Sequence, residues 1–292
     1  MNCPYKLKYL DAPRGWHDNP SNARDFRDCF RMSWLSFCYL VNTVREQGFG
    51  YNESADDAIG RRVASLELML LAYLALIGDT IKFSQLETVT HLKPQTHRNF
   101  FKFFSKFGYN KLYPLFVTFP ATPQEMSEAM GPFTRAGMPG CVGATDGVHV
   151  ELLNCPAQFL IESTGKEGFP SRVWNVTCDF SRRFYHSTVG YFGSYNDKRI
   201  VRFDRLMLDL RENKLAPDTE WYTFNSEGGM DQHVGGLYVI CDGGYHPQWK
   251  SMQTNLNNSG VAFVEIWSNM HESLRKCIEC AFGILKVGCF FV

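Results

Sequence analysis

Two short apolar runs in the second half of the chain have the pattern of buried strands, and each run ends on an aspartate. Residues 141–145 are Cys-Val-Gly-Ala-Thr and precede Asp146, whereas residues 237–241 are Leu-Tyr-Val-Ile-Cys and precede Asp242. Apolar runs of this length that are bounded by turn residues are typical of strands in a buried sheet. The pattern therefore predicts two core strands, each with a carboxylate at its end.

A third acidic residue belongs to a stretch with helical periodicity. Apolar residues recur at helical intervals over residues 274–285, and Glu279 lies inside this stretch. Glu272 competes with Glu279 for the same role, because close to two helical turns separate them and both fall on nearly the same face. The neighbouring Arg275 and Lys276 either reach phosphate oxygens or form ordinary surface pairs with these acids. Two strands and a helix can thus bring distant carboxylates to one point.

Clustered carboxylates need a compensating charge. In a low dielectric they repel each other, and one of them takes up a proton. Hard cations such as Mg²⁺ prefer oxygen ligands and also bind the phosphate oxygens of a substrate. Two such ions about 4 Å apart can activate a nucleophile and stabilise the leaving oxygen of a phosphodiester. The alternative interpretation is that each aspartate is a turn residue and that Glu279 is a solvated helix position.

The first half of the chain, residues 1 to about 135, has a predominantly helical pattern. An amphipathic segment begins at residues 24–32, and a second helix runs from about Ser65 to Leu76. Residues 83–107 indicate two short helices joined by a turn, the arrangement of a helix-turn-helix. Repeated proline and glycine then interrupt helix and mark a domain boundary, which we place near residue 135.

The second helix of this pair has a cationic face. At about 100° per residue, Arg98, Lys102 and Lys106 fall in one narrow stripe. No acid occurs between Thr88 and Lys111, so these cations are not compensated locally, as expected of an element that meets a phosphate backbone. A solvated helix face has the same pattern. On the opposite side lie four phenylalanines that we expect in the core, namely Phe100, Phe103, Phe104 and Phe107.

Composition limits the class of protein. With 292 residues and 45% hydrophobic content, the chain can bury a large core and divide into two domains. The formal net charge is +0, so local patches must supply the cations that a nucleic-acid enzyme needs. There is no signal-peptide pattern and no apolar run of membrane length, so the ten cysteines are expected as reduced thiols of an intracellular protein. Cys277 and Cys280 have the spacing of a zinc half-site, but no second pair accompanies them.

Five segments of the second half resemble, in order, the nuclease domain of the PIF/Harbinger transposases, a DDE-type family with an RNase H-like fold. They are Gly143–His149, Trp174–Asp179, Gly193–Asp197, Cys241–Tyr245 and Glu272–Lys286. The resemblance implies that Asp146, Asp242 and Glu279 are the catalytic acids. It also implies that Asp197 joins these three as a metal ligand. Without the resemblance, Asp197 would be interpreted as the N-cap of a helix that begins near Lys198.

The same resemblance implies an α/β fold, with an RNase H-like mixed sheet flanked by helices over residues 136–292, after an all-α N-terminal domain. The implied activity is metal-dependent cleavage and strand transfer of DNA, with two Mg²⁺ or Mn²⁺ ions. The implied partners are DNA, a Myb-like accessory protein and further copies of the chain, without a membrane. The implied location is the nucleus, or the cytoplasm when the partner is absent. Relatives continue beyond the point where this chain ends, so a truncated or decayed copy is expected. Two rivals remain, namely an inactive DNA-binding or scaffolding derivative and a hydrolase of small phosphates.

Overall fold

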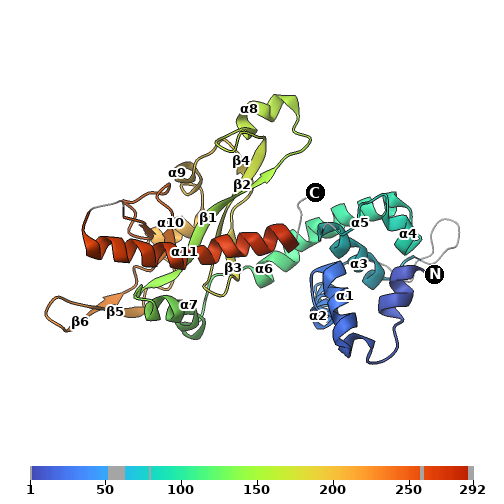
Figure 1. Cartoon of the computed structure of the whole chain (residues 1–292), viewed down its shortest axis with the longest axis horizontal. Coiled ribbons are helices and arrows are strands. Elements are labelled where there is room, and N and C mark those ends of the chain that lie inside the picture. Colours follow the sequence, from blue (N-terminus) through green and yellow to red (C-terminus); the bar gives the residue numbers. More distant parts are fainter. Residues whose placement is uncertain (1, 52–62, 79, 257–259, 289–292) are drawn as a thin grey trace. The chain divides into compact units, whose positions relative to one another are not determined.

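The computed structural model describes residues 2–51, 63–78, 80–256 and 260–288, and the chain forms two compact units (Figure 1). Unit 1 comprises the chain up to Phe116 together with the chain from Ile284 onward, and unit 2 is Val117–Gly283. Within the described residues, unit 1 is helical and every strand belongs to unit 2. The predicted combination of a helical N-terminal region and a mixed α/β region is therefore confirmed.

Unit 1 is built from short helices around an aromatic and aliphatic core. Its helices are α1 (Pro20–Phe30), α2 (Trp34–Glu46), α3 (Leu66–Ile77), α4 (Leu86–Thr90), α5 (Pro94–Phe107) and α6 (Tyr113–Phe116), with helical turns at Lys6–Leu10, Trp16–Asp18 and Gly108–Leu112. Three of these helices begin where the sequence provides a polar cap, because Asn19, Ser33 and Ser65 each accept a backbone N–H in the first turn of α1, α2 and α3. The predicted helix from about Ser65 is α3, whose apolar residues are buried on all sides.

A buried side-chain hydrogen bond joins α4 to α5. The hydroxyl of Thr90 and Nε2 of His97 are 2.8 Å apart, and both residues are buried. Between the two helices His91 adopts a left-handed conformation with φ of 57° and ends α4. The predicted pair of short helices joined by a turn is thus present.

Unit 2 contains a six-stranded mixed sheet (Figure 1). Its strands are β1 (Cys141–Glu151), β2 (Ser171–Cys178), β3 (Phe184–Ser187), β4 (Tyr191–Phe192), β7 (Tyr238–Cys241) and β8 (Met252–Thr254). The order is β3-β2-β1-β7-β8, with β4 also paired to β2. β2 is antiparallel to both β1 and β3, whereas β7 is parallel to β1 and β8 is parallel to β7. A separate hairpin is formed by β5 (Glu220–Phe224) and β6 (Met230–Val234).

The end of β7 agrees with the sequence, but the end of β1 does not. β7 ends at Cys241, so Asp242 directly follows a buried strand as predicted. β1 continues for five residues beyond Asp146 to Glu151, and Asp146 pairs with Val176 in the middle of the strand. The prediction of a strand end at Asp146 was wrong, because the Asp-Gly pair that suggests a turn lies within a long antiparallel pairing with β2.

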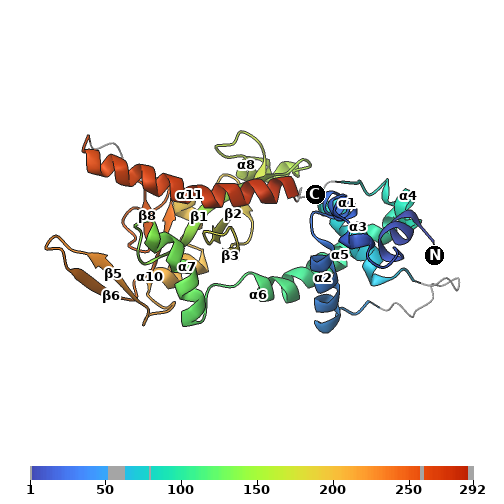
Figure 2. The same ribbon diagram turned by 60° about the horizontal axis from the view of Figure 1, so that its bottom comes forward.

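Helices cover both faces of the sheet. On one face α11 (Ala262–Gly288) packs Leu274 and Ile278 into a cluster with Ala144 and Val148 of β1. In both views of the fold this long helix crosses over the strands β1 and β2 (Figures 1 and 2). On the other face the buried residues of α10 (Arg205–Arg211) pack against alternate strand positions such as Val142. The sheet is therefore buried between helices, as its apolar strands predict.

Among the described residues, the remaining helices of unit 2 are α7 (Pro123–Arg135) and two short helices. α7 precedes the boundary that the sequence places near residue 135, yet it contacts β1 and belongs to unit 2. It begins with a capping box formed by Thr122 and Glu125. α8 (Leu160–Ser163), preceded by the turn Ala157–Phe159, and α9 (Asp197–Ile200) each have four residues.

Two further expectations concern the chain as a whole. The nine cysteines that the structure describes are all free. Of the helices in the described ranges, none is long and apolar enough to span a membrane.

Candidate active site

The register of the sheet places Asp146 and Asp242 on neighbouring strands. Ala144 of β1 pairs with Ile240 of β7 in a parallel ladder, and the aspartates lie two residues beyond each member of this pair. Side chains alternate along a strand, so both aspartates point to the face on which Ala144 and Ile240 meet α11.

Backbone N–H groups hold both carboxylates. Gly147 donates a hydrogen bond of 2.8 Å to Oδ1 of Asp146, and Gly244 donates one of 2.7 Å to Oδ1 of Asp242. Each aspartate is thus oriented by a glycine that follows it closely in the chain.

Asp197 brings a third carboxylate against these glycines. It is the first residue of α9, and the cap of this helix is Asn196, whose side chain accepts the N–H of Arg199 at 2.9 Å. The interpretation of Asp197 as an N-cap was therefore wrong. A methyl group placed on Gly147 would lie 3.2 Å from Oδ1 of Asp197, and one on Gly244 would lie 2.8 Å from Oδ2. The methyl position on Gly244 is also 2.9 Å from Oδ1 of Asp242, so the carboxylates of Asp197 and Asp242 flank one glycine.

Arg275 of α11 joins the helix acids to Asp146. Its Nη1 donates to Oδ2 of Asp146 at 3.1 Å, and its Nε and Nη2 donate to the two oxygens of Glu272 at 3.1 and 2.7 Å. Nη2 also contacts Glu279. The side chain of Arg275 is only 9% exposed, so it is neither an ordinary surface pair nor a free phosphate ligand. Both Glu272 and Glu279 are linked to Asp146 through this guanidinium.

Burial dominates the electrostatics of Asp146. It raises the pKa of this carboxyl from the ordinary 3.8 to about 6. The N–H of Gly147 and the charge of Arg275 act in the opposite direction. The charges of Asp242 and Asp197 raise the pKa further, which is the mutual repulsion expected of clustered acids.

The other acids respond to the same surroundings. Burial raises the pKa of Asp197, Lys166 opposes this shift, and the charge of Asp242 adds to it. The hydrogen bond from Arg275 lowers the pKa of Glu272, and the same bond raises the pKa of Arg275. Carboxylate charge at the site is thus balanced in part by an internal cation.

The side chains at this site that could bind a metal ion all offer carboxylate oxygens. Oxygen ligands with negative charge suit a hard divalent cation. As the chain is folded, however, the described residues contain no group of three or more His, Cys, Asp or Glu side chains close enough to hold a metal ion. Arg275 contacts Asp146, Glu272 and Glu279 instead.

A buried polar network supports the site from the opposite face of the sheet. The amide of Asn175 on β2 donates to Oδ2 of Asp204 at 2.7 Å and to the hydroxyl of Thr145 at 3.1 Å. Its carbonyl oxygen accepts the hydroxyl of Tyr245 at 2.7 Å. Asp204 is fully buried, and Nε2 of His186 lies 3.0 Å from its Oδ1. Because Thr145 precedes Asp146 and Tyr245 follows Asp242, Asn175 ties together the two strands that carry the acids.

The predicted DNA-binding residues lie on one exposed stripe of α5 in unit 1. Arg98, Lys102 and Lys106 are all exposed on this helix, and the guanidinium of Arg98 lies 5.5 Å from the ring centre of Phe83. On the other side, Phe100 and Phe104 are buried as predicted. The prediction fails for Phe103, which is 56% exposed although its ring contacts Phe49.

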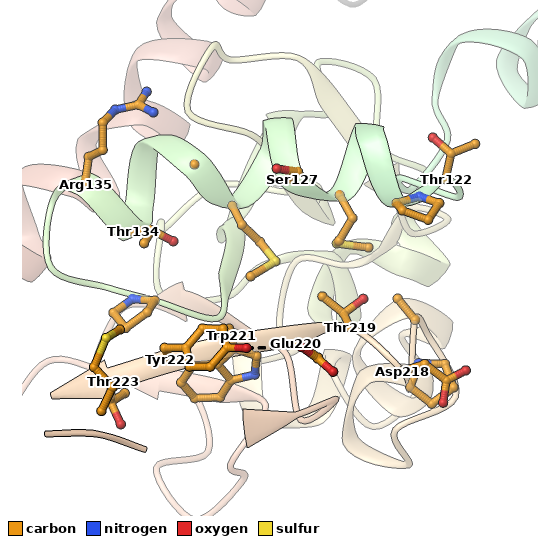
Figure 3. A pocket seen from close by; sticks show the side chains of 18 of the residues that line it. Thr122, Ser127, Thr134, Arg135, Asp218, Thr219, Glu220, Trp221, Tyr222 and Thr223 are labelled. Atoms are coloured by element: carbon orange, nitrogen blue, oxygen red, sulfur yellow. Dashed lines mark hydrogen bonds between the residues drawn. The ribbon is translucent and has the colours of Figure 1, made fainter. Parts of the chain in front are cut away.

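A separate cavity of about 1070 Å³ lies between α7 and the β5–β6 hairpin. Figure 3 shows side chains of α7, among them Ser127 and Thr134, facing Trp221 and its neighbours on β5. Arg135 lies at one end of this cavity and Asp218 at the other. None of the predicted site residues lines it.

A family model described as plant transposon protein covers residues 122–292, which is more than half of the chain. The chain belongs to the plant transposon protein family. No curated protein and no solved structure matches it. The matched part of this plant transposon protein contains the sheet, α11 and all four predicted acids, whereas the cationic helix α5 lies outside it.

Two features of this plant transposon protein were not predicted from its sequence. One is the central position of Arg275, for which the spacing Glu272-x-x-Arg275-x-x-x-Glu279 is a usable signal, since both acids are one helical turn away. The other is the network around Asn175. Its signal is a single amide in the otherwise apolar or β-branched end of β2.

Proposed function

We propose that this plant transposon protein is a DDE-type transposase of the PIF/Harbinger kind, or a host protein derived from one, which hydrolyses phosphodiester bonds of DNA. One observation carries the proposal. Asp146 of β1 and Asp242 after β7 lie on adjacent strands, Asp197 lies against the same glycines, and Glu279 contacts the guanidinium that binds Asp146. Turn residues and solvated helix positions have no reason to converge in this way.

The topology of the sheet supports an RNase H-like fold for unit 2. Three antiparallel strands are followed by two parallel ones in the order β3-β2-β1-β7-β8. The first and central strand carries Asp146, its parallel neighbour leads to Asp242, and the last helix carries Glu279 across one face. We therefore propose for unit 2 the RNase H-like fold that the five sequence segments imply.

The site suits divalent metal in its donor chemistry. Asp146, Asp197, Asp242 and Glu279 would hold two Mg²⁺ or Mn²⁺ ions, which when bound supply the activation of water and the stabilisation of the leaving oxygen. The chain itself fixes the carboxylates through Gly147 and Gly244 and keeps much of Asp146 away from water. Arg275 balances the charge of Asp146 and orients the two glutamates of α11.

The helical unit would supply binding to DNA. Arg98, Lys102 and Lys106 form an exposed cationic stripe on α5, for which a phosphate backbone is the natural partner. By resemblance we also propose a nuclear location, a Myb-like accessory protein and assembly of several copies, since transposition must hold two DNA ends.

The proposal is tested by nicking of supercoiled plasmid with the purified chain and Mn²⁺. We expect Asp146→Asn and Asp242→Asn to abolish the activity. Asp179→Asn is the matched control, because Asp179 accepts Ser181 and Arg183 in the β2–β3 turn and an asparagine oxygen can do the same. Equal nicking by wild type and by Asp146→Asn would indicate a contaminating nuclease and remove the proposal.

A second function is favoured by the ion pairs of Arg275. Because a guanidinium already compensates Asp146 and both glutamates, the same residues could be retained in an inactive DNA-binding or scaffolding derivative. Calorimetric titration with Mn²⁺ separates the two functions. A nuclease binds the ion with heat that Asp242→Asn abolishes, whereas an inactive derivative binds duplex DNA and gives no metal-dependent heat.

A further inference from the structure

The segment that follows Asp197 is cationic and exposed. Lys198, Arg199 and Arg202 are all exposed, and none of them forms an ion pair with any part of the chain that the structure describes. Their neighbour Arg205 differs, because its guanidinium is 2.8 Å from Asp209. Lys198 and Arg199 belong to α9, and Arg202 follows its end. These three residues are named the α9 cationic face. In a chain with formal net charge +0, this local excess of positive charge needs an explanation.

Aromatic rings hold the central cation of this face in place. The guanidinium of Arg199 lies 3.6 Å from the ring centre of Tyr195. Tyr195 stacks on Tyr191, with ring centres 6.0 Å apart, and Tyr191 contacts Phe203. Stacking on a ring covers one face of the guanidinium and leaves its N–H donors, which lie in its plane, free to bind phosphate oxygens. Less side-chain entropy is then lost on binding than for a free lysine.

The α9 cationic face adjoins the carboxylate site. Asp197, whose carboxylate lies against Gly147 and Gly244, immediately precedes Lys198. The carbonyl of Lys198 accepts Nε2–H of His246 at 3.1 Å, which connects α9 to the loop after Asp242. The cations are thus held to both segments that carry the acids.

We propose that the α9 cationic face binds the backbone phosphates of the DNA strand that is cut at the carboxylates. The inference rests on the proposed function and names residues that position its substrate. Clustered acids repel a polyanion, so a nuclease with no net positive charge needs cations beside its acids to bring the strand into contact. Lys198, Arg199 and Arg202 meet this need without neutralising the acids themselves, since none of them is paired with Asp197 or Asp242.

The test is binding of a fluorescein-labelled DNA duplex to the full chain in EDTA, followed by fluorescence anisotropy at several salt concentrations. The variant K198Q/R199Q/R202Q removes the face. The control R182Q/R183Q/K214Q removes the same charge at exposed positions elsewhere in unit 2. We expect the first variant to raise Kd by about tenfold or more and to lower the slope of log K against log salt by about 2 to 3. The control should stay within about twofold of wild type.

A single substitution separates charge from geometry. Arg199→Lys keeps the charge but loses the planar stacking on Tyr195, so we expect an unchanged salt slope and Kd raised about threefold. If the triple variant proves too unstable to measure, Arg199→Lys alone still tests the inference.

The inference and the proposed function fail in different ways. Binding and salt slope of K198Q/R199Q/R202Q equal to the control overturn the inference, even if Mn²⁺-dependent nicking is intact. Face-dependent binding by a chain that never nicks DNA keeps the contact between this face and DNA phosphates but removes the nuclease.

Discussion

Arg275 on α11 donates a hydrogen bond of 3.1 Å to the carboxylate of Asp146 on β1, which lies 129 residues earlier in the chain. The same guanidinium contacts Glu272 and Glu279, so one cation connects the central strand to the helix that covers it. Because the side chain of Arg275 is 9% exposed, this contact is formed largely away from water. Such a pair is costly to break, since the remaining charge keeps its burial and loses its partner.

The first prediction concerns the loss of this cation. We expect Arg275→Ala to lower the free energy of unfolding at pH 7 by about 2 kcal/mol, less than for a fully buried pair because Glu272 and Glu279 are partly exposed. Urea denaturation followed by circular dichroism measures this. Lys276→Ala is the matched control at the next, exposed position and should cost less than about 0.5 kcal/mol. Equal midpoints for both variants would show that Arg275 has no structural role.

The second prediction uses two consecutive glycines after Asp242. A methyl group on Gly244 would lie 2.8 Å from Asp197 and 2.9 Å from Asp242, whereas Gly243 has open space around it. We expect Gly244→Ala to displace a carboxylate and weaken Mn²⁺ binding by about tenfold, the usual size of an effect on ligand orientation. Calorimetric titration measures the affinity. Gly243→Ala should bind Mn²⁺ as wild type does, and similar losses in both variants would contradict the role of Gly244.

Patterns in the sequence predicted several of the elements, but not all of them and not all of their ends. Alternation and apolar runs located β7 and α11, because these elements bury their apolar residues in the core. The residues after Asp146 also alternate, with Val148 buried, yet the Asp-Gly turn signal outweighed this pattern. The β5–β6 hairpin was not predicted, since most of its residues are exposed and it has no buried face to give a period.

Chemistry at the site was only partly predictable, because sequence spacing does not show which side chains meet. Asp146 and Asp242 could be selected from their strands, whereas Asp197 required the resemblance to a known family. Arg275 shows the limit, since an arginine one turn before a glutamate is most often a surface pair. Only the packing of α11 on β1 makes it a buried partner of Asp146.

The third prediction concerns the network behind the acids. Asn175 satisfies the buried Asp204, Thr145 and Tyr245 at once. We expect Asn175→Ala to cost about 3 kcal/mol, because it removes a hydrogen bond from a buried carboxylate as well as from two hydroxyls. Tyr245→Phe removes only one of these bonds and should cost about 1 kcal/mol. Urea denaturation of both variants shows which loses more free energy of unfolding. A larger loss for Tyr245→Phe would contradict the central role of Asn175 in this hydrogen-bond network.

The fourth prediction concerns acid sensitivity of unit 1. Burial lowers the pKa of His97 from the ordinary 6.5 to about 4, so the folded chain resists a proton that the unfolded chain accepts. The stability that the neutral His97 contributes is therefore fully present above pH 6.5, and it is lost as the pH falls toward 4. Between pH 8 and pH 5 we expect a loss of about 2 kcal/mol from this residue. His97→Gln cannot titrate and its amide can still reach Thr90, so urea denaturation of this variant should show a correspondingly smaller loss. The same pH dependence in both proteins would mean that other groups cause it.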